Sequence, residues 1–464
     1  MRPLKDNIIG YCVKFLLWVL EFEPNIATPT LKDPFYNTFA ELNIDGQSQE
    51  EALNSQRRLM ILFLKEYLSN APRNQPIVFE NLNSRLFLKY LLTIKKSNGQ
   101  DPGQSKFRLH RTALFHLFRI YEVEQPPQLE KQLNQSFRGL NRTSAQQITN
   151  GNAPIKIGKD PLDFSLLRVI GTSHLKSSKK EHVFSHCFLL LCWNLMCRAG
   201  NCVSICYEHI EWKEDALCIY FAHMKNDQTG QRPRDPRHIY ANPVMPEICL
   251  ILALGIYLLC YNANVRGKLF PGASQYDRFR KLFTKLLENN CSEDLFARGL
   301  THNDLGTHSL RKGASSYCSS GSTACPPSVA VHLGGVQDRY LRYEAAGDQY
   351  VGRTVSGLPL THEQFATLPP FFKERNELLS STIQECFTNL PNNLKLVSEF
   401  CLASVVYHKS FLVNTLPKTH VLFNASLFRN QNRFTRLFEL VECRLPQSND
   451  LLKPTGIPPH VLLI

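Results

Sequence analysis

The chain has 464 residues, of which 43% are hydrophobic and 20% are charged, with 53 Lys+Arg against 40 Asp+Glu. This composition is too apolar for a disordered protein, and the length suffices for roughly two to four domains at ~150 residues each. The formal net charge of +13 favours an anionic partner, with nucleic acid ahead of a membrane surface.

Residues 1–49 are predicted to form an N-terminal extension of unknown role. Residues 1–51 carry 4 basic and 8 acidic side chains, unlike the rest of this basic chain. The apolar run Phe15–Leu20 is far shorter than the ~20 residues that a membrane span requires, and no small-residue cleavage site follows it. We therefore expect no membrane partner and no secretion.

Most of the excess charge lies in residues 52–159, which carry 17 Lys/Arg and 6 Asp/Glu. Apolar and basic residues alternate at helical spacing in three runs, at 57–68, 84–96 and 106–121, the second opened by Ser84 as a cap. A solvated basic face over an apolar face would give the same pattern. We predict a helical DNA-binding module over residues 50–140 that grips phosphates. Its candidate DNA ligands are Arg57, Arg58, Lys89, Lys95, Lys96, Arg108 and Arg111.

The aromatic side chains of the third run are Phe107, Phe115 and Phe118. We expect them in a hydrophobic core rather than as platforms for base stacking, because apolar residues at helical spacing more often face a core.

The second half of the chain mixes helices with short strands. Residues 141–159 are polar, contain Asn150-Gly151 and lack periodicity, which predicts an interdomain linker. Over residues 160–358, apolar helices at 183–196 and 247–259 alternate with strands at 217–221 and from His238. Residues 359–464 show helical periodicity again and are predicted to form a helical C-terminal region. The fold class is therefore mainly α with a small β-sheet (α+β).

The 15 cysteines are an odd number, and five of them crowd one segment, at Cys187, Cys192, Cys197, Cys202 and Cys206. That segment has no CxxC pair, which disfavours a structural zinc site. We interpret these residues as small apolar side chains of a buried helix in a reduced, intracellular protein. No metal and no disulfide are expected. The chain also lacks a nucleotide-binding phosphate loop, so we expect no cofactor.

The clearest candidate for chemistry is the segment Thr-His-Ser-Leu-Arg-Lys-Gly at 307–313. His308 and Arg311 are three apart on a predicted helix, so they share a face and could reach one phosphate. Arg198 ends an apolar helix, where we expect it to be buried, and Lys225 lies where a predicted strand enters its turn. Two alternatives stay open: Arg198 could be a structural ion-pair partner, and Lys225 could be a solvated turn residue.

This order of residues, followed by a segment rich in tyrosine and arginine at 334–343, resembles the tyrosine recombinases. More specifically, residues 224–228, 235–243, 308–313 and 334–340 resemble recombinase-like proteins of Crypton-type DNA transposons. The resemblance covers about residues 50–360. It implies a helical core-binding domain at 50–140 and a tyrosine-recombinase-like catalytic domain at 160–358.

The resemblance also implies a function, which is DNA recombination and integration of a mobile element. Double-stranded DNA would be the partner, the protein would form homo-oligomers on DNA, and it would reside in the nucleus. Arg198 and Arg311 would bind the nonbridging phosphate oxygens as bidentate donors. Tyr340 would attack phosphorus and form a 3′-phosphotyrosyl link, while Lys225 would protonate the departing 5′ oxygen and His308 would assist proton transfer.

The nucleophile and the activity itself stay open. Tyr340 has the motif context of the family, whereas Tyr343 has its spacing, 32 residues after Arg311. The family places a Trp or His nine residues before the nucleophile, and His332 precedes Tyr340 by eight. The alternative to an active recombinase is therefore a catalytically decayed or domesticated protein that binds DNA without cutting it.

Overall fold

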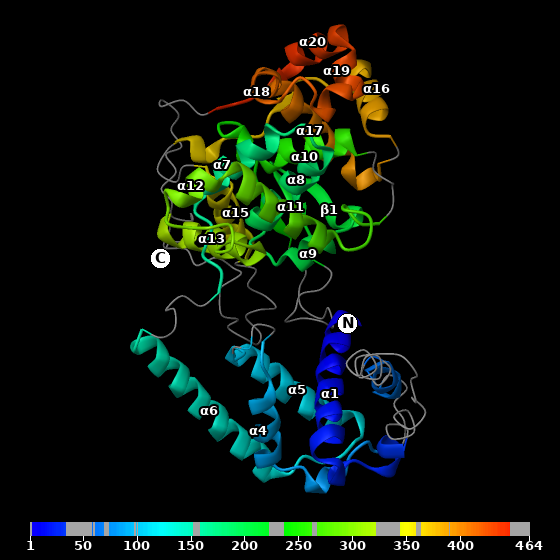
Figure 1. Ribbon diagram of the computed structural model, residues 1–464. Coiled ribbons are helices and arrows are strands. Elements are labelled where there is room, and N and C mark those ends of the chain that lie inside the picture. The colour runs from blue at the N-terminus through cyan, green and yellow to red at the C-terminus, as the bar shows by residue number, and fades with distance from the viewer. Residues whose placement is uncertain are drawn as a thin grey trace, which may run out of the picture. The chain divides into compact units, whose positions relative to one another are not determined.

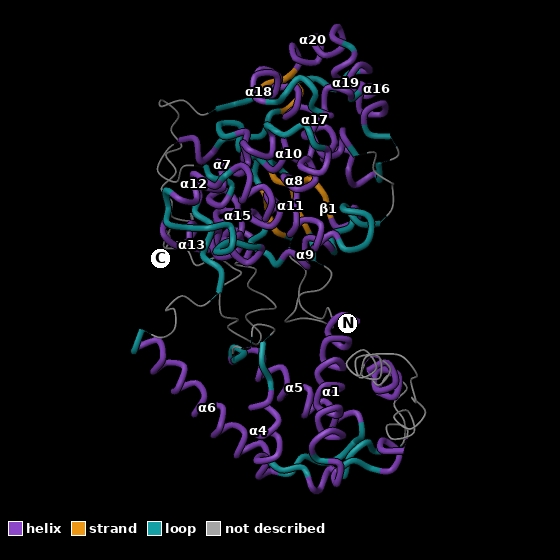
Figure 2. The backbone as a smooth tube through the Cα atoms, in the orientation of Figure 1, coloured by secondary structure: helices purple, strands orange, loops and turns teal. Residues whose placement is uncertain are grey.

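The computed structural model of the protein describes residues 2–33, 58, 61–68, 74–96, 99, 101–151, 158–221, 236–261, 267–321, 344–358, 363–388 and 390–445. The chain divides into two compact units, Met1–Ile157 and Gly158–Ile464, and each has a hydrophobic core of its own. Helices predominate in both units, and the strands of the described residues lie in the second (Figure 2). The predicted fold class, mainly α with a small β-sheet, is confirmed.

Helices of the first unit that Figure 1 labels are α1 (Arg2–Phe22), α4 (Ser84–Thr93), α5 (Gln104–Ile120) and α6 (Pro127–Thr149), and residues 61–68 are helical as well. Helix α1 packs against α5, and its apolar run shares one core with side chains of α4, α5 and α6. The apolar run within residues 1–49 is therefore core structure. The third predicted basic run is α5, and Phe107, Phe115 and Phe118 pack in or against the core, which confirms the core interpretation.

The prediction that Ser84 caps the second run is wrong. The cap of α4 is Asn83, whose Oδ1 accepts a hydrogen bond from the N–H of Leu86 at 3.0 Å, whereas Ser84 donates to Gln132 of α6. The segment predicted as a linker from residue 141 is helical as far as Thr149. The last buried residue of α6 is Phe137. The turns of the helix after it are mostly polar, so the sequence shows no helical periodicity there.

The second unit holds a small antiparallel sheet with strand order β1 (Ile210–Lys213), β2 (Ala216–Ile219) and β3 (Arg237–Ile239). Trp212 lies opposite Leu217, and Cys218 lies opposite His238. The two predicted strands are confirmed as β2 and β3, while β1 was not predicted. All four residues of β2 are buried, so this strand is the core of the sheet.

Helix α8 (Lys180–Asn194) runs through the middle of the second unit, and every side chain from Val183 to Asn194 is buried. Packed against it are α7 (Phe164–Leu175), α10 (Leu250–Cys260) and α11 (Gln275–Asn290). Three further helices contact it: α9 (Ala199–Val203), α13 (Thr307–Gly321) and α15 (Glu344–Val355). The predicted apolar helices at 183–196 and 247–259 are thus confirmed as α8 and α10.

The C-terminal region belongs to the same core. Its helices are α16 (Glu377–Cys386), α17 (Lys395–Tyr407), α18 (Lys409–Thr415), α19 (Ser426–Arg429) and α20 (Gln431–Leu440). Helix α17 packs against α10 and β1, and short strands β4 (Phe371–Phe372) and β5 (Val441–Glu442) pair beside it. A Cβ added at Gly255 of α10 would lie 2.8 Å from the carbonyl oxygen of Cys401, so the two helix backbones approach closely.

Within the described ranges, no single helix is long and apolar enough to cross a membrane. The pair Asn392–Tyr407 and Lys409–Thr415 meets the requirement only when joined across a bend of 63°.

Helix α13 is anchored through its first turns to the segment that precedes α7. The N–H of Leu162 donates to the carbonyl of Ser309 at 3.0 Å, and that of Asp160 donates to Asp304 at 2.8 Å. A Cβ added at Gly313 would collide with the carbonyl oxygen of Leu162. Glycine is therefore required there for the close approach that fixes α13.

We expect Gly313→Ala to lower the free energy of unfolding by about 2–3 kcal/mol, because the added methyl group forces backbone apart in a packed region. Gly200→Ala is the matched control, since nothing lies within 4 Å of a Cβ there, and it should leave stability unchanged or raise it by up to ~1 kcal/mol. Denaturant unfolding of the full chain measures both. Equal effects of the two substitutions would contradict this packing.

Candidate functional site

The chain turns sharply where α8 ends. The N–H of Met196 donates to the carbonyl of Trp193 at 3.0 Å, and the N–H of Cys197 donates to Cys192 at 3.3 Å. These are the two bonds of a Schellman motif, and Met196 takes the left-handed conformation it needs, with φ 45°. Glycine usually fills that position, so a methionine there is uncommon.

Arg198 follows this turn and is the N-cap residue of α9. Its side chain is exposed, so the expectation of a buried guanidinium is wrong. The reason is that α8 stops at Asn194 and the left-handed turn then carries the chain to the surface. The apolar run alone did not reveal where the helix ends.

Arg198 is near enough for its positive charge to act on Arg311, although 113 residues separate the two in the sequence. Arg311 is half-buried on α13, and His308, three residues earlier on that helix, is exposed. Burial and the positive charge of Arg198 lower the pKa of Arg311, while the sulfur of Cys197 acts in the opposite direction. Two guanidinium groups held near each other repel, and a bound anion would relieve that repulsion. This arginine pair can therefore bind a phosphate.

The other predicted catalytic residues lie outside the described residues. They are Lys225, His332, Tyr340 and Tyr343, and Arg57 of the predicted DNA-binding set is outside as well. Helix α15 begins at Glu344, immediately after Tyr343. The contacts that hold α15 therefore lie close in sequence to both candidate nucleophiles.

A buried carboxylate holds α15 to the sheet. Asp348 accepts hydrogen bonds from Arg237 Nη1 at 2.6 Å and from the backbone N–H of His238 at 2.8 Å, and its Oδ2 lies 3.0 Å from His238 Nδ1. Gly352, one turn later, lets α15 approach the backbone of β3, since a Cβ would collide with the carbonyl of His238. Sequence reasoning missed this anchor, because Asp348 and its partners are more than 100 residues apart.

The anchor is electrostatically reinforced. Burial disfavours the charge on Asp348, but the bonds from His238 and Arg237 lower its pKa below the usual range. Burial likewise opposes protonation of His238, but its hydrogen bonds with Asp348 and Cys218 raise the pKa of the imidazole to about 9. The pair is therefore an imidazolium and a carboxylate at neutral pH.

The predicted DNA ligands that the structure describes fall into two groups. Lys89 lies 2.5 Å from Glu23, Lys95 lies 2.5 Å from Asp101, and Arg111 lies 3.8 Å from Glu130. Arg58, Lys96 and Arg108 are exposed, and none of them forms an ion pair with another residue that the structure describes. The charges of this second group are therefore accessible from solvent.

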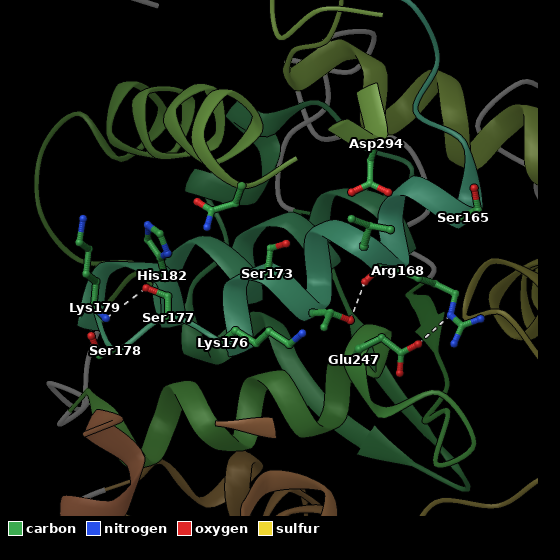
Figure 3. A pocket seen from close by; sticks show the side chains of 13 residues that line it. Ser165, Arg168, Ser173, Lys176, Ser177, Ser178, Lys179, His182, Glu247 and Asp294 are labelled. Carbon is green, nitrogen blue, oxygen red and sulfur yellow. Dashed lines mark hydrogen bonds and ion pairs between the residues drawn. The ribbon is translucent and has the colours of Figure 1, made fainter. Parts of the chain in front are cut away.

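A pocket of about 820 Å³ lies elsewhere in the second unit, along α7 and the start of α8 (Figure 3). Lys176, Lys179 and His182 line it, and so do the carboxylates of Glu247 and Asp294. Figure 3 shows the guanidinium of Arg168 turned to Glu247, at 2.7 Å. Charges of both signs line this pocket, and neither Arg198 nor Arg311 is among its lining residues.

No protein-family model matches this chain, and no curated protein matches it. Two similar solved structures are complexes of the site-specific recombinase XerH. The post-cleavage complex with palindromic difH substrate has 14% identity and a TM-score of 0.33, covering 67% of this chain and 83% of that one. The pre-cleavage complex with difH substrate has 15% identity and a TM-score of 0.33, covering 66% and 83%. A likeness at this TM-score does not by itself assign an activity.

The anchor predicts a pH dependence of stability. A histidine whose pKa is raised on folding contributes stability that is complete below pH 6.5 and is lost as the pH rises through about 9. The free energy of unfolding should fall over this window by on the order of 2 kcal/mol through His238. His238→Gln should abolish this part of the slope, and His302→Gln, elsewhere in the unit, should keep it. Parallel slopes in wild type and His238→Gln would disprove the anchor.

Proposed function

We propose that this protein binds double-stranded DNA and acts as a tyrosine-recombinase-like enzyme of the Crypton type. It would cleave and rejoin DNA strands through a 3′-phosphotyrosyl intermediate, in the recombination and integration of a mobile element. The observation that carries the proposal is the closeness of Arg198 and Arg311, with His308 on the same helix as Arg311. These residues come from separate elements, in the order and with the neighbours of the recombinase motifs.

The arginine pair supports this chemistry for a physical reason. When a tyrosine oxygen attacks phosphorus, negative charge builds up on the nonbridging oxygens of the phosphate. Two guanidinium groups stabilise that charge best when they are already in place before the reaction, and each can donate two parallel hydrogen bonds. The packing of α13 and the turn after α8 supply such fixed positions for Arg311 and Arg198.

The remaining steps follow from the balance of bonds and protons. The attacking tyrosine, Tyr340 or Tyr343, forms an O–P bond as the bond from phosphorus to the 5′ oxygen breaks. Lys225 would give a proton to that oxygen, and His308 would assist proton transfer from the tyrosine. The phosphotyrosyl bond conserves the energy of the phosphodiester, so a 5′ hydroxyl can reverse the step without a nucleotide cofactor.

The first unit would supply phosphate contacts away from the reacting phosphate. Arg58, Lys96 and Arg108 are its best candidates, because their charges are exposed and form no ion pairs with other described residues. Strand exchange joins two DNA sites, so we also propose homo-oligomers on DNA. Residence in the nucleus follows from the proposed substrate.

DNA affinity should depend on salt through these side chains. Lys96→Ala or Arg108→Ala should each reduce the slope of log affinity against log salt by about 1. Lys89→Ala is the matched control. The ammonium of Lys89 already pairs with Glu23, so its contact with DNA would release fewer counterions. Fluorescence anisotropy with a random-sequence duplex between roughly 50 and 200 mM salt measures the three slopes. The proposed interface is wrong if Lys89→Ala has the largest effect.

Covalent trapping tests the chemistry directly. A preferred duplex is first selected by binding from a random pool, then nicked at successive positions so that the 5′ leaving strand diffuses away. The wild type should form an adduct that resists detergent, and one of Tyr340→Phe and Tyr343→Phe should abolish it. Arg311→Lys should slow the adduct on the order of 100-fold, because a lysine keeps the charge but loses the bidentate fork.

Arg375→Lys is the control for the arginine substitution, since Arg375 is exposed and pairs with Glu399. It should trap DNA at the wild-type rate. Tight, salt-sensitive binding without any adduct would favour the alternative, a decayed or domesticated DNA-binding protein. An adduct retained in both tyrosine variants would exclude the proposed nucleophiles.

A further inference from the structure

Three cysteine sulfurs meet behind the arginine pair. Sγ of Cys202 lies 3.3 Å from that of Cys192 and 3.2 Å from that of Cys197. All three sulfurs lie within 4.8 Å of one another. The sequence pattern suggested dispersed core residues of one helix, but the structure gathers these three into a cluster.

The turn after α8 explains how residues spaced by five come together. In a Schellman motif the residue after the left-handed position contacts the residue five places earlier, and here these two are Cys197 and Cys192. Helix α9 then begins at Ala199 and brings Cys202 back onto the end of α8. Three different elements, the last turn of α8, the connecting turn and α9, thus each contribute one sulfur.

The cluster is closed off from solvent and has a positive neighbour. Cys192 and Cys202 are 0% exposed and Cys197 is 6% exposed. The guanidinium of Arg311 lies close enough to interact with the sulfur of Cys197. Burial raises the pKa of the Cys192 and Cys202 thiols, so these thiols would lose their protons only when a metal ion binds, since thiolates are the form of cysteine that binds metal ions.

We propose that Cys192, Cys197 and Cys202 bind a thiophilic closed-shell metal ion, Zn²⁺ or Cu⁺, through three thiolates. At a metal–sulfur distance of ~2.3 Å, the sulfurs of a tetrahedral site are about 3.8 Å apart. Two of the observed separations, 3.2 and 3.3 Å, are shorter than this value, so side-chain shifts of about half an ångström would bring these sulfurs to the spacing of a metal site. Soft thiolate ligands select these two ions over Mg²⁺, Ca²⁺ or Mn²⁺.

Binding would release three protons to water and change no oxidation state. Three thiolates leave a net charge of −1 around Zn²⁺ or −2 around Cu⁺, and Arg311 would offset part of it. The ion would then fix the turn after α8, and with it the neighbouring Arg198. This inference concerns metal binding alone, and it stands or falls without the proposed DNA cleavage.

The test is metal content of the full chain, purified under reducing conditions and offered Zn²⁺ or Cu⁺ in separate arms. Elemental analysis should find about one ion per chain in the wild type. Single substitutions Cys192→Ser, Cys197→Ser and Cys202→Ser should each weaken binding at least tenfold in a chelator competition. Cys187→Ser and Cys249→Ser are matched controls, because both thiols are buried and lie outside the cluster. They should bind like the wild type.

X-ray absorption spectroscopy of the metal-bound wild type tests the proposal independently of the serine variants, which could fail to fold. It should show three sulfur neighbours at about 2.3 Å from the metal. Failure of both ions to bind would overturn the proposal, and so would equal weakening in the control variants. A disulfide between any two of the three cysteines, found by mass spectrometry of the reduced preparation, would also overturn it.

Discussion

Helix α8 is buried on every side, and the second unit is organised by that constraint. A helix without a polar face needs neighbours all round it, and six helices contact it here. The chain can return to the surface only beyond the C-terminal end of such a helix. The residue at which α8 ends therefore determines which of the following side chains are exposed. The left-handed residue Met196 makes that stop, and Arg198 is the first exposed side chain beyond it.

The same helix positions the partners of Arg198. Helix α13 packs on α8 and brings Arg311 to the end where Arg198 emerges, while α15 packs on α8 and is pinned to β3 by Asp348. The arginine pair and the helix that follows the candidate tyrosines therefore pack on the same buried helix. Residues far apart in sequence act together because they pack against the same buried helix.

The sequence predicted the elements whose signal is local. Runs with one apolar face gave α4 and α5, and continuous apolar runs gave α8 and α10. Strand β1 has only four residues and no flanking turn signal of its own, and the polar end of α6 makes no core contact. Both therefore escaped prediction.

The sequence identified which residues could form the candidate site, but it did not predict how they are arranged. The motifs pointed to Arg198 and Arg311, but their closeness depends on how α13 packs, and the exposure of Arg198 depends on a turn made by a methionine instead of a glycine. The cysteine cluster was misjudged for the same reason, since spacings of five bring side chains together across a Schellman turn and not along a helix. The bond between Asp348 and His238 leaves no local trace in the sequence at all.

The contact between Gly255 and Cys401 limits where segments of this chain could be exchanged with those of a related protein. Because α10 and α17 touch backbone to backbone, the surface of each is shaped to the other. An exchange of sequence between residues 260 and 395 would join two helices that were not selected together, and a large side chain on either would separate them. We therefore expect residues 158–464 to tolerate replacement only as one block, whereas an exchange near residue 157, between the two compact units, would leave both cores intact.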